Sequence, residues 1–209
     1  GQSLKHDIQI IDDITHIKSG DFLILVSCHD FIGAEIRSNF KYALLLHASD
    51  LPKGRGWSPH VWDIINGSSY LTLSLLEVTD PIDTGDVWKK TKIPLEGHEL
   101  YDEIDHLLFS HEINLINFAI ENFRNIKPIK QSVNNVTYYD RRNSQDSEID
   151  TSKSISSQWN LLRVCDIDRY PPFVYLDASK YILKVRKEKN LSKNNKNLKE
   201  LDINKPISS

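Results

Sequence analysis

The sequence predicts an α/β fold built on a mainly parallel sheet. Apolar runs of strand length alternate with segments of helical periodicity, and residues 43–46 (ALLL) suit a strand buried inside a parallel sheet. This run ends on His47, and a glycine-spaced polar loop follows it. Ser58-Pro59 then supplies an N-cap and a proline for the first position of a helix. The order of strand, loop and helix therefore places His47 at the carboxyl end of a strand, where open α/β sheets hold their sites.

The other elements follow from hydrophobic pattern and turn residues. A long packing helix is expected from residues 97–99 to Arg124, because apolar residues recur there at three- and four-residue steps. In residues 69–77, leucines alternate with Thr72 and Ser74, which predicts a strand with one face more exposed to water than the other. The remaining expected elements are an edge strand at 6–11, a buried strand at 22–27, a helix at 59–66 stopped by Gly67, a strand at 87–94, a short helix at 158–164 and a hairpin from 169–175 and 180–185.

Composition describes an ordinary globular chain with room for one sizeable core. Of its 209 residues, 39% are hydrophobic and 26% charged, and the net charge of −3 argues against a general nucleic-acid binder. The sequence has no membrane-length apolar stretch and no signal-peptide character, so neither a membrane nor an export route is expected. Cys28 and Cys165 are far apart without metal-ligand spacing, which predicts a cytoplasmic protein with no metal. The absence of methionine indicates an interior or processed start.

A second strand downstream favours a catalytic role for His47. A lone histidine at a strand end is either catalytic or a hydrogen-bonded core residue. Residues 70–77 form another strand-like run, and the tight turn after it carries Asp83. Two adjacent strands that end at the same sheet edge bring a carboxylate beside the imidazole, which is how a general acid/base is prepared. Cys28 is better interpreted as a small buried residue than as a nucleophile.

Two motifs at a fixed separation resemble a known family. The stretch HASDLPKGRGWSP begins at His47, and DTGD begins at Asp83, 83 − 47 = 36 positions later. This pattern resembles the formyltransferases that use 10-formyltetrahydrofolate, which act on methionyl-tRNA, glycinamide ribonucleotide or sugar nucleotides. The matching residues are His47, Ser49, Leu51, Pro52, Arg55, Gly56, Asp83 and Gly85. The resemblance implies a Rossmann-like core at residues 1–126 that lacks its first βα unit, a helix and hairpin extension at 127–187 and a mobile tail at 188–209.

The same resemblance implies a set of site residues. His47 and Asp83 are the expected catalytic residues, and no metal is expected. The expected folate-binding residues are Asp30, Phe31, Ile32, Trp57, Thr79, Asp80, Pro81 and Ile82, and the expected substrate-binding residues are Ser49, Lys53, Arg55 and Arg142. Several alternatives stay open: Phe31 and Ile32 are equally suited to start a helix that runs to Asn39, Trp57 to packing, Lys53 and Arg55 to a solvated loop, and Arg141 or Arg142 to tying the extension onto the core.

The implied reaction is transfer of a formyl group to an amine. The amine attacks the formyl carbon, a tetrahedral oxyanion forms, and His47 accepts a proton while Asp83 supports the imidazole. Relatives supply an asparagine two residues before the histidine for the oxyanion, where this chain has Leu45. A protonated His47, a backbone amide or a water is the expected replacement, and loss of activity is the alternative.

The acceptor expected from the resemblance is a nucleotide-linked amino sugar. Methionyl-tRNA formyltransferases carry a further C-terminal barrel of about 100 residues, and glycinamide ribonucleotide enzymes lack the YYDRR and RYPPF segments that this chain has. The alternatives are a purine-pathway transformylase and a degenerate folate- or nucleotide-binding protein. A homodimer with Phe173 and Tyr175 in its interface is also left open.

Overall fold

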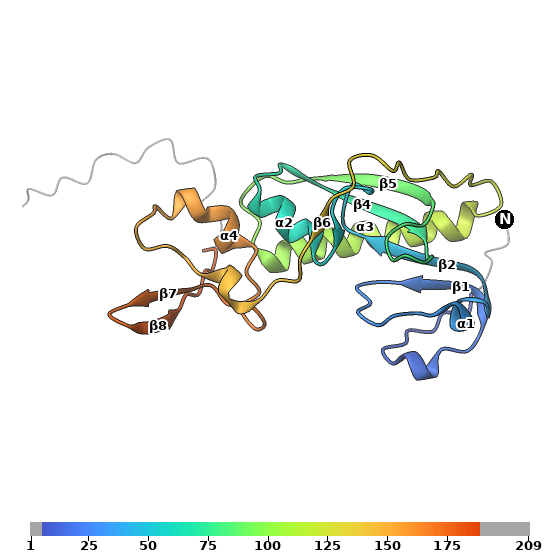
Figure 1. The fold of residues 1–209 in the computed structure, drawn as a ribbon, viewed down its shortest axis with the longest axis horizontal. Helices are drawn as coiled ribbons and strands as arrows, with labels where there is room; N and C mark the ends of the chain where they lie inside the picture. Colours follow the sequence, from blue (N-terminus) through green and yellow to red (C-terminus); the bar gives the residue numbers. More distant parts are fainter. Residues whose placement is uncertain (1–5, 189–209) are drawn as a thin grey trace, which may run out of the picture.

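A four-stranded sheet forms the centre of the computed structural model, which describes residues 6–188 (Figure 1). Its strands lie in the order β1 (Gly20–Leu25), β2 (Phe40–His47), β4 (Tyr70–Glu77) and β5 (Val87–Pro94). β1 and β2 are parallel, whereas the β2–β4 and β4–β5 pairs are antiparallel. The expectation of a mainly parallel sheet is therefore wrong for the described strands. The loop between β4 and β5 is shorter than the dozen or so residues that a parallel crossover requires, so the two strands form a hairpin.

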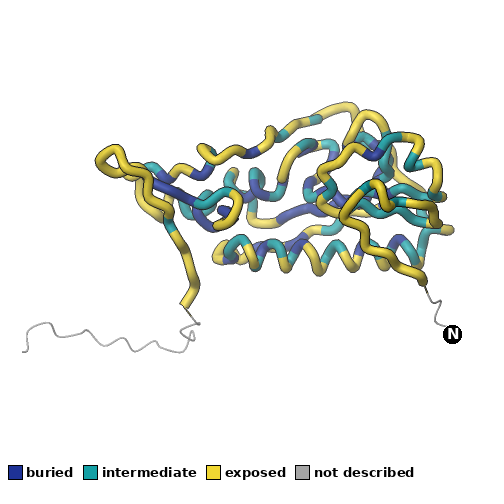
Figure 2. The backbone as a smooth tube through the Cα atoms, turned by 90° about the horizontal axis from the view of Figure 1, so that it is seen from below, coloured by how far each residue is buried: buried dark blue, intermediate teal, exposed yellow. Residues whose placement is uncertain are grey.

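One long helix covers a face of this sheet and completes the core. The helix α3 (Tyr101–Asn122) confirms the predicted packing helix, and in Figure 2 buried residues recur among exposed ones along it. Its buried residues share one cluster with the inward side chains of β2, β4 and β5: Leu44, Leu46, Leu71, Leu73, Leu75, Ile93, Ile104, Leu108, Leu115 and Ala119.

The N-terminal segment differs from its prediction. Residues 6–11 form no strand and are exposed, with Ile10 97% exposed, because no neighbouring strand pairs with them within the described residues. A 3-10 helix, Ile14–His16, follows, and the buried strand expected at 22–27 is β1, which is only half-buried because it lies at the end of the sheet. The helix considered for residues 31–39 is the single turn α1 (Ala34–Arg37).

The segment after His47 contains a two-residue strand and then the predicted helix. β3 (Arg55–Gly56) pairs in parallel with β6 (Tyr138–Tyr139), which follows α3 in the chain. Gly56 has φ +94°, and a Cβ there would lie 2.4 Å from the carbonyl oxygen of Tyr139, so only glycine fits. The helix α2 (Pro59–Ile65) starts and stops as predicted, but Ser58 has φ +45° and its side chain makes no capping hydrogen bond.

The face of β4 that carries its polar residues is also dry, contrary to prediction. Thr72 is 4% exposed and Ser74 is fully buried. Ser74 satisfies its hydroxyl by donating to the carbonyl oxygen of Ser49 at 2.7 Å. β4 lies between two strands and is covered on both faces, which sequence alternation alone does not reveal.

The extension consists of short elements that end in a projecting hairpin (Figure 1). The short helix and the hairpin predicted for it are confirmed, whereas the mobile tail falls, from residue 189 on, outside the described residues. In chain order the elements are the 3-10 helices Ser144–Ser147 and Ser156–Gln158, α4 (Trp159–Arg163) and the antiparallel strands β7 (Phe173–Leu176) and β8 (Ser179–Ile182).

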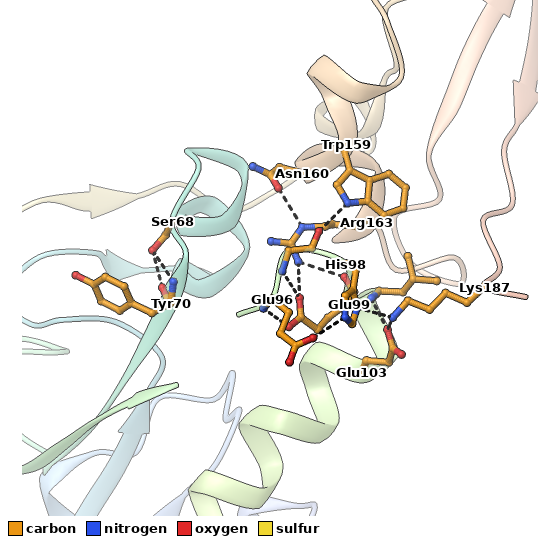
Figure 3. Close-up of polar contacts among 12 residues, drawn as sticks. Ser68, Tyr70, Glu96, His98, Glu99, Glu103, Trp159, Asn160, Arg163 and Lys187 are labelled. Carbon is orange, nitrogen blue, oxygen red and sulfur yellow. Dashed lines mark hydrogen bonds and ion pairs between the residues drawn. The ribbon is translucent and has the colours of Figure 1, made fainter. Parts of the chain in front are cut away.

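A buried ion pair joins the extension to the start of α3 (Figure 3). Nη1 of Arg163 donates to the carbonyl oxygen of Glu99 at 3.2 Å and to its carboxylate at 3.3 Å. Trp159 donates from its indole nitrogen to the carbonyl oxygen of Gly97 at 2.9 Å. Burial opposes the charge of Glu99, but hydrogen bonds from the Glu96 and Gly97 amides and the charge of Arg163 lower the pKa of this carboxyl.

Candidate active site

β2 delivers His47 to the edge of the sheet. Leu44 and Leu46 point into the core, so Leu45 and His47 lie on the opposite face of the strand. The His47 imidazole is buried, and its Nε2 lies 2.9 Å from the carbonyl oxygen of Gly54. A carbonyl can only accept a hydrogen bond, so Nε2 carries a proton and Nδ1 is the ring nitrogen that is left to take up another.

Asp83 lies beside this ring in the loop between β4 and β5. Its Oδ1 is 3.6 Å from Nδ1 of His47, and its Oδ2 accepts a hydrogen bond from the Gly56 amide at 2.9 Å. Asp83 is 8% exposed and has φ +62°, a conformation that costs a residue other than glycine about 1 kcal/mol or more. The two strands thus bring the carboxylate and the imidazole together, as their sequence positions predicted.

A cavity of about 730 Å³ opens around this pair. One wall comes from the end of β1 and the residues after it up to Ile32, from Trp57 and from the loop that carries Asp83. A second wall comes from the start of α2, from α3 and from the extension. The residues of this second wall include His60, Tyr101, Asp105, Glu112, Arg142, Asp166, Arg169 and Tyr170.

Most of the predicted folate-binding residues line the first wall, whereas only one predicted substrate-binding residue lines the cavity. The former are Asp30, Phe31, Ile32, Trp57, Thr79, Asp80 and Ile82, and the latter is Arg142. Pro81, Ser49, Lys53 and Arg55 are not part of the lining. Ser49 is 1% exposed, Lys53 is exposed in the loop before β3, and the buried Arg55 donates to Gln131 and Tyr138.

The first wall presents apolar surface to the cavity. Phe31 is 61% exposed and Ile82 is 60% exposed, although both are large hydrophobic residues. Trp57 is also partly exposed, with the ring of His29 stacked on it at 5.5 Å and the guanidinium of Arg141 4.7 Å from its ring centre. Exposed aromatic and aliphatic side chains around a concave site are typical of a binding surface for a flat organic ligand.

Leu45 lines the cavity on the same face of β2 as His47. Its side chain packs against a small apolar cluster made by Leu51, Leu76 and Val87. An aliphatic side chain donates no hydrogen bond, so the position two residues before the histidine contributes packing and no oxyanion donor.

Apart from Arg142, the titratable side chains of the second wall are ones that sequence reasoning missed. Burial, followed by the charges of His47, Arg142 and Arg169, lowers the pKa of His60 to about 4, and its Nδ1 is buried without a partner among the described residues. Burial and a hydrogen bond to Asp105 raise the pKa of Tyr101 to about 12. The only available signals were the position of His60 just after the Ser58-Pro59 helix start and the RYPP segment, because these residues meet only in the folded chain.

Comparisons with known proteins agree with the family that the His47 and Asp83 motifs resemble. The sequence model of the formyl transferase family matches residues 2–118. The chain belongs to the formyl transferase family. It is 31% identical to the methionyl-tRNA formyltransferase of Clostridium novyi over 93% of this chain and 62% of that protein. The chain spans about 60% of the length of the curated relatives that it matches first.

Solved formyltransferases share its fold. A 4-N formyltransferase from Francisella tularensis has a TM-score of 0.67 and 20% identity over 81% of this chain and 72% of that one. An N-formyltransferase from Helicobacter canadensis, in complex with folinic acid and dTDP-3-aminofucose, has a TM-score of 0.59 and 20% identity over 75% of this chain and 59% of that one. These likenesses confirm the Rossmann-like formyltransferase core.

Formyl transferases use formyl-tetrahydrofolate, and the cavity fits such a ligand. The exposed apolar rim made by Phe31 and Ile82 suits a flat ring, and the cavity volume lies within the range of small-molecule sites. Within residues 6–188, no cluster of three ligating side chains suits a metal ion, and no helix has both the length and the apolar character to cross a bilayer.

Proposed function

We propose that this chain transfers a formyl group from 10-formyltetrahydrofolate to the amino group of a nucleotide-linked amino sugar. One observation carries the proposal: the buried His47–Asp83 pair opens into a single cavity whose lining combines exposed apolar side chains with arginines from the extension. The exposed apolar side chains suit the folate ring, and the arginines suit a polar acceptor. The pair lies where the two ligands would meet.

The folate is held by the first wall. Phe31, Ile82 and Trp57 contact its ring, and backbone groups of residues 79–82 reach its polar edge. Arg37 forms an ion pair with Asp80, which steadies this loop at the cavity. The folate supplies the formyl group, and the protein supplies position and proton transfer.

The charged wall recognises the acceptor through its arginines. Arg142 is 6% exposed, its Nη2 donates to Ser147 at 3.0 Å, and its guanidinium lies over the ring of Tyr170. These contacts tie the extension together and also fix the guanidinium at the cavity. Arg169, which is ion-paired with Asp166, also lines the cavity, and two guanidinium groups in one cavity suit the pyrophosphate of a nucleotide-linked sugar.

His47 handles the proton that the reaction releases. The acceptor nitrogen forms a bond to the formyl carbon, the bond from that carbon to the folate nitrogen breaks, and the amine proton passes through Nδ1 of His47 to the folate nitrogen. A proton held on Nδ1 lies against the Asp83 carboxylate, which stabilises it by charge. A backbone amide or a bound water serves the oxyanion, because Leu45 donates nothing and Nε2 of His47 already donates to Gly54.

A second candidate function is formylation of methionyl-tRNA. The relatives in Clostridium that the chain matches carry that name. This candidate shares the folate and the His47–Asp83 pair and differs only in the acceptor, so direct comparison of acceptors separates the two.

The test is formyl transfer from 10-formyltetrahydrofolate to a panel of nucleotide-linked 3-amino and 4-amino sugars, glycinamide ribonucleotide and methionyl-tRNA. We expect turnover on one sugar nucleotide, reduced at least about 100-fold in His47→Ala and unchanged in the control His106→Ala, whose histidine is exposed on α3. Turnover on methionyl-tRNA or glycinamide ribonucleotide alone would replace the sugar acceptor. Folate binding without turnover on any acceptor would indicate a binding protein.

A further inference from the structure

The imidazole of His47 is oriented by two groups that both lie in loops. Nε2 contacts the Gly54 carbonyl and Nδ1 faces the Asp83 carboxylate. Gly54 precedes the two-residue strand β3, and Asp83 lies in the turn between β4 and β5. Neither partner is fixed by the central sheet, so another part of the chain has to set their positions.

Gln131 holds the Asp83 loop. Its amide nitrogen donates to the carbonyl oxygens of Asp83 at 2.9 Å and of Gly85 at 2.8 Å. Its amide oxygen accepts from Nη2 of buried Arg55 at 2.8 Å. Two acceptors on one side and a donor on the other fix the orientation of the amide without ambiguity. Gln131 therefore connects the left-handed backbone of Asp83 to the residue that follows Gly54.

Thr137 holds the other partner of His47. Its hydroxyl accepts a hydrogen bond from the Gly54 amide at 2.8 Å, and its carbonyl oxygen accepts from the Arg55 amide at 2.9 Å. The pairing then continues into β6, which lies beside β3. The peptide unit before Gly54 is thus anchored through its N–H, while the Gly54 carbonyl points to the histidine.

Both anchors belong to one stretch of chain, residues 129–139. It begins where Ile129 pairs with Val87 next to the Asp83 loop and ends in β6. The stretch lies beyond residue 118, where the match to the family's sequence model ends. We infer that residues 129–139 form a brace in which Gln131 and Thr137 act as positioning residues for the two partners of His47. The effect on catalysis rests on the proposed function, whereas the effect on the imidazole does not.

The test uses two near-isosteric variants of the full chain, Gln131→Met and Thr137→Val, with Val133→Thr as the control. Val133 lies in the same stretch and is 88% exposed. The first readout is the ring nitrogen spectrum of ¹⁵N-histidine-labelled protein without substrates, with the His47 signals assigned by His47→Asn. We expect these signals to shift in both variants toward those of a ring without fixed partners and to stay in place in the control.

The second readout is formyl transfer from 10-formyltetrahydrofolate to dTDP-3-aminofucose. We expect kcat to fall roughly 10- to 100-fold in both variants, because a small displacement of the reacting groups costs that much, while KM for the folate stays within about twofold. Unchanged His47 signals in both variants would overturn the brace. Shifted signals in a protein that transfers no formyl group to this acceptor would support the brace and count against the proposed acceptor.

Discussion

At the scale of single residues, the two groups beside the His47 imidazole determine the chemistry of this site. The imidazole has a carbonyl oxygen, a hydrogen-bond acceptor, beside Nε2 and a carboxylate beside Nδ1. This arrangement suits a group that takes up and returns one proton at Nδ1. Asp83 matters through its charge and its place, since its backbone conformation is one that other residues rarely adopt.

Replacement of Asp83 by asparagine tests the charge alone. We expect Asp83→Asn to lower kcat at least about 100-fold and to leave the dissociation constant of the folate within about threefold, because the side chain keeps its shape. Asp86→Asn is the matched control, since Asp86 lies in the same loop but does not line the cavity. Single-turnover transfer and folate titration measure the two quantities, and equal losses in both variants would refute a specific role for Asp83.

His60 predicts a dependence of stability on pH. Its pKa is lowered to about 4 from the usual 6.5, so between these values the unfolded chain binds a proton that the folded chain does not. Stability therefore falls as the pH decreases from about 6.5 to 4, by at most about 3 kcal/mol from this group. His60→Asn should reduce that loss in urea unfolding at pH 7 and pH 4.5. An unchanged difference between the two pH values would contradict the buried neutral imidazole.

The elements divide into a sheet that positions the pair and an extension that closes the cavity. β2 and the β4–β5 hairpin bring His47 and Asp83 together, while Arg142 and Arg169 reach the cavity from the extension. The Arg163–Glu99 ion pair connects the two parts (Figure 3). A buried pair of this kind contributes little when both partners are compared with apolar residues, but removal of one partner leaves an unpaired buried charge.

Removal of Arg163 should therefore loosen the extension. We expect Arg163→Met to lower the free energy of unfolding by about 3 kcal/mol, with Arg124→Met, at an exposed position just after α3, as the near-neutral control. Because the pKa of Glu99 is lowered in the folded chain, its stabilisation is present above about 4.5 and is lost as the pH falls. Chemical denaturation gives the difference, and equal stabilities of the two variants at pH 7 would contradict the assignment.

At the scale of the whole molecule, one cavity is shared by two parts of the chain. The core supplies the wall with the exposed apolar side chains, and the extension supplies the two arginines of the other wall, Arg142 and Arg169. Figure 2 shows the buried residues concentrated along the sheet and α3, whereas the hairpin of the extension is exposed toward its tip. Changes in the extension should therefore affect the acceptor and leave the folate unaffected.

Arg169→Gln tests this division. Arg169 forms an ion pair with Asp166 and donates to the hydroxyl of Tyr101 at 2.6 Å, but its side chain is largely exposed, so its loss should not unfold the chain. We expect KM for a nucleotide-linked amino sugar to rise about tenfold or more, through loss of a charge-assisted hydrogen bond, with KM for the folate unchanged. Arg186→Gln, outside the cavity lining, is the control. A rise in the folate KM instead would place Arg169 at the other ligand.

The elements that could be predicted are those that short stretches of sequence specify. Strong apolar runs identified β2, β4, β5 and α3, and turn residues identified the loop of Asp83 and the hairpin of the extension. The edge strand predicted from the weak alternation of residues 6–11 was wrong, because an alternating segment forms a strand only where another strand pairs with it. Ser58 fits the cap pattern in sequence but adopts a left-handed conformation in the loop that leads from β3 into α2.

The sequence by itself predicted the family, the pair His47 and Asp83 and most residues of the first wall of the cavity, because these lie in short motifs at strand ends. Only the tertiary structure decided the sheet direction, the second wall of the cavity and the contacts of Gln131 and Thr137. Those features depend on residues that are distant along the chain, such as Gln131 and Asp83, 48 positions apart. A contact of that kind is made by the packing of whole elements, and no local pattern encodes it.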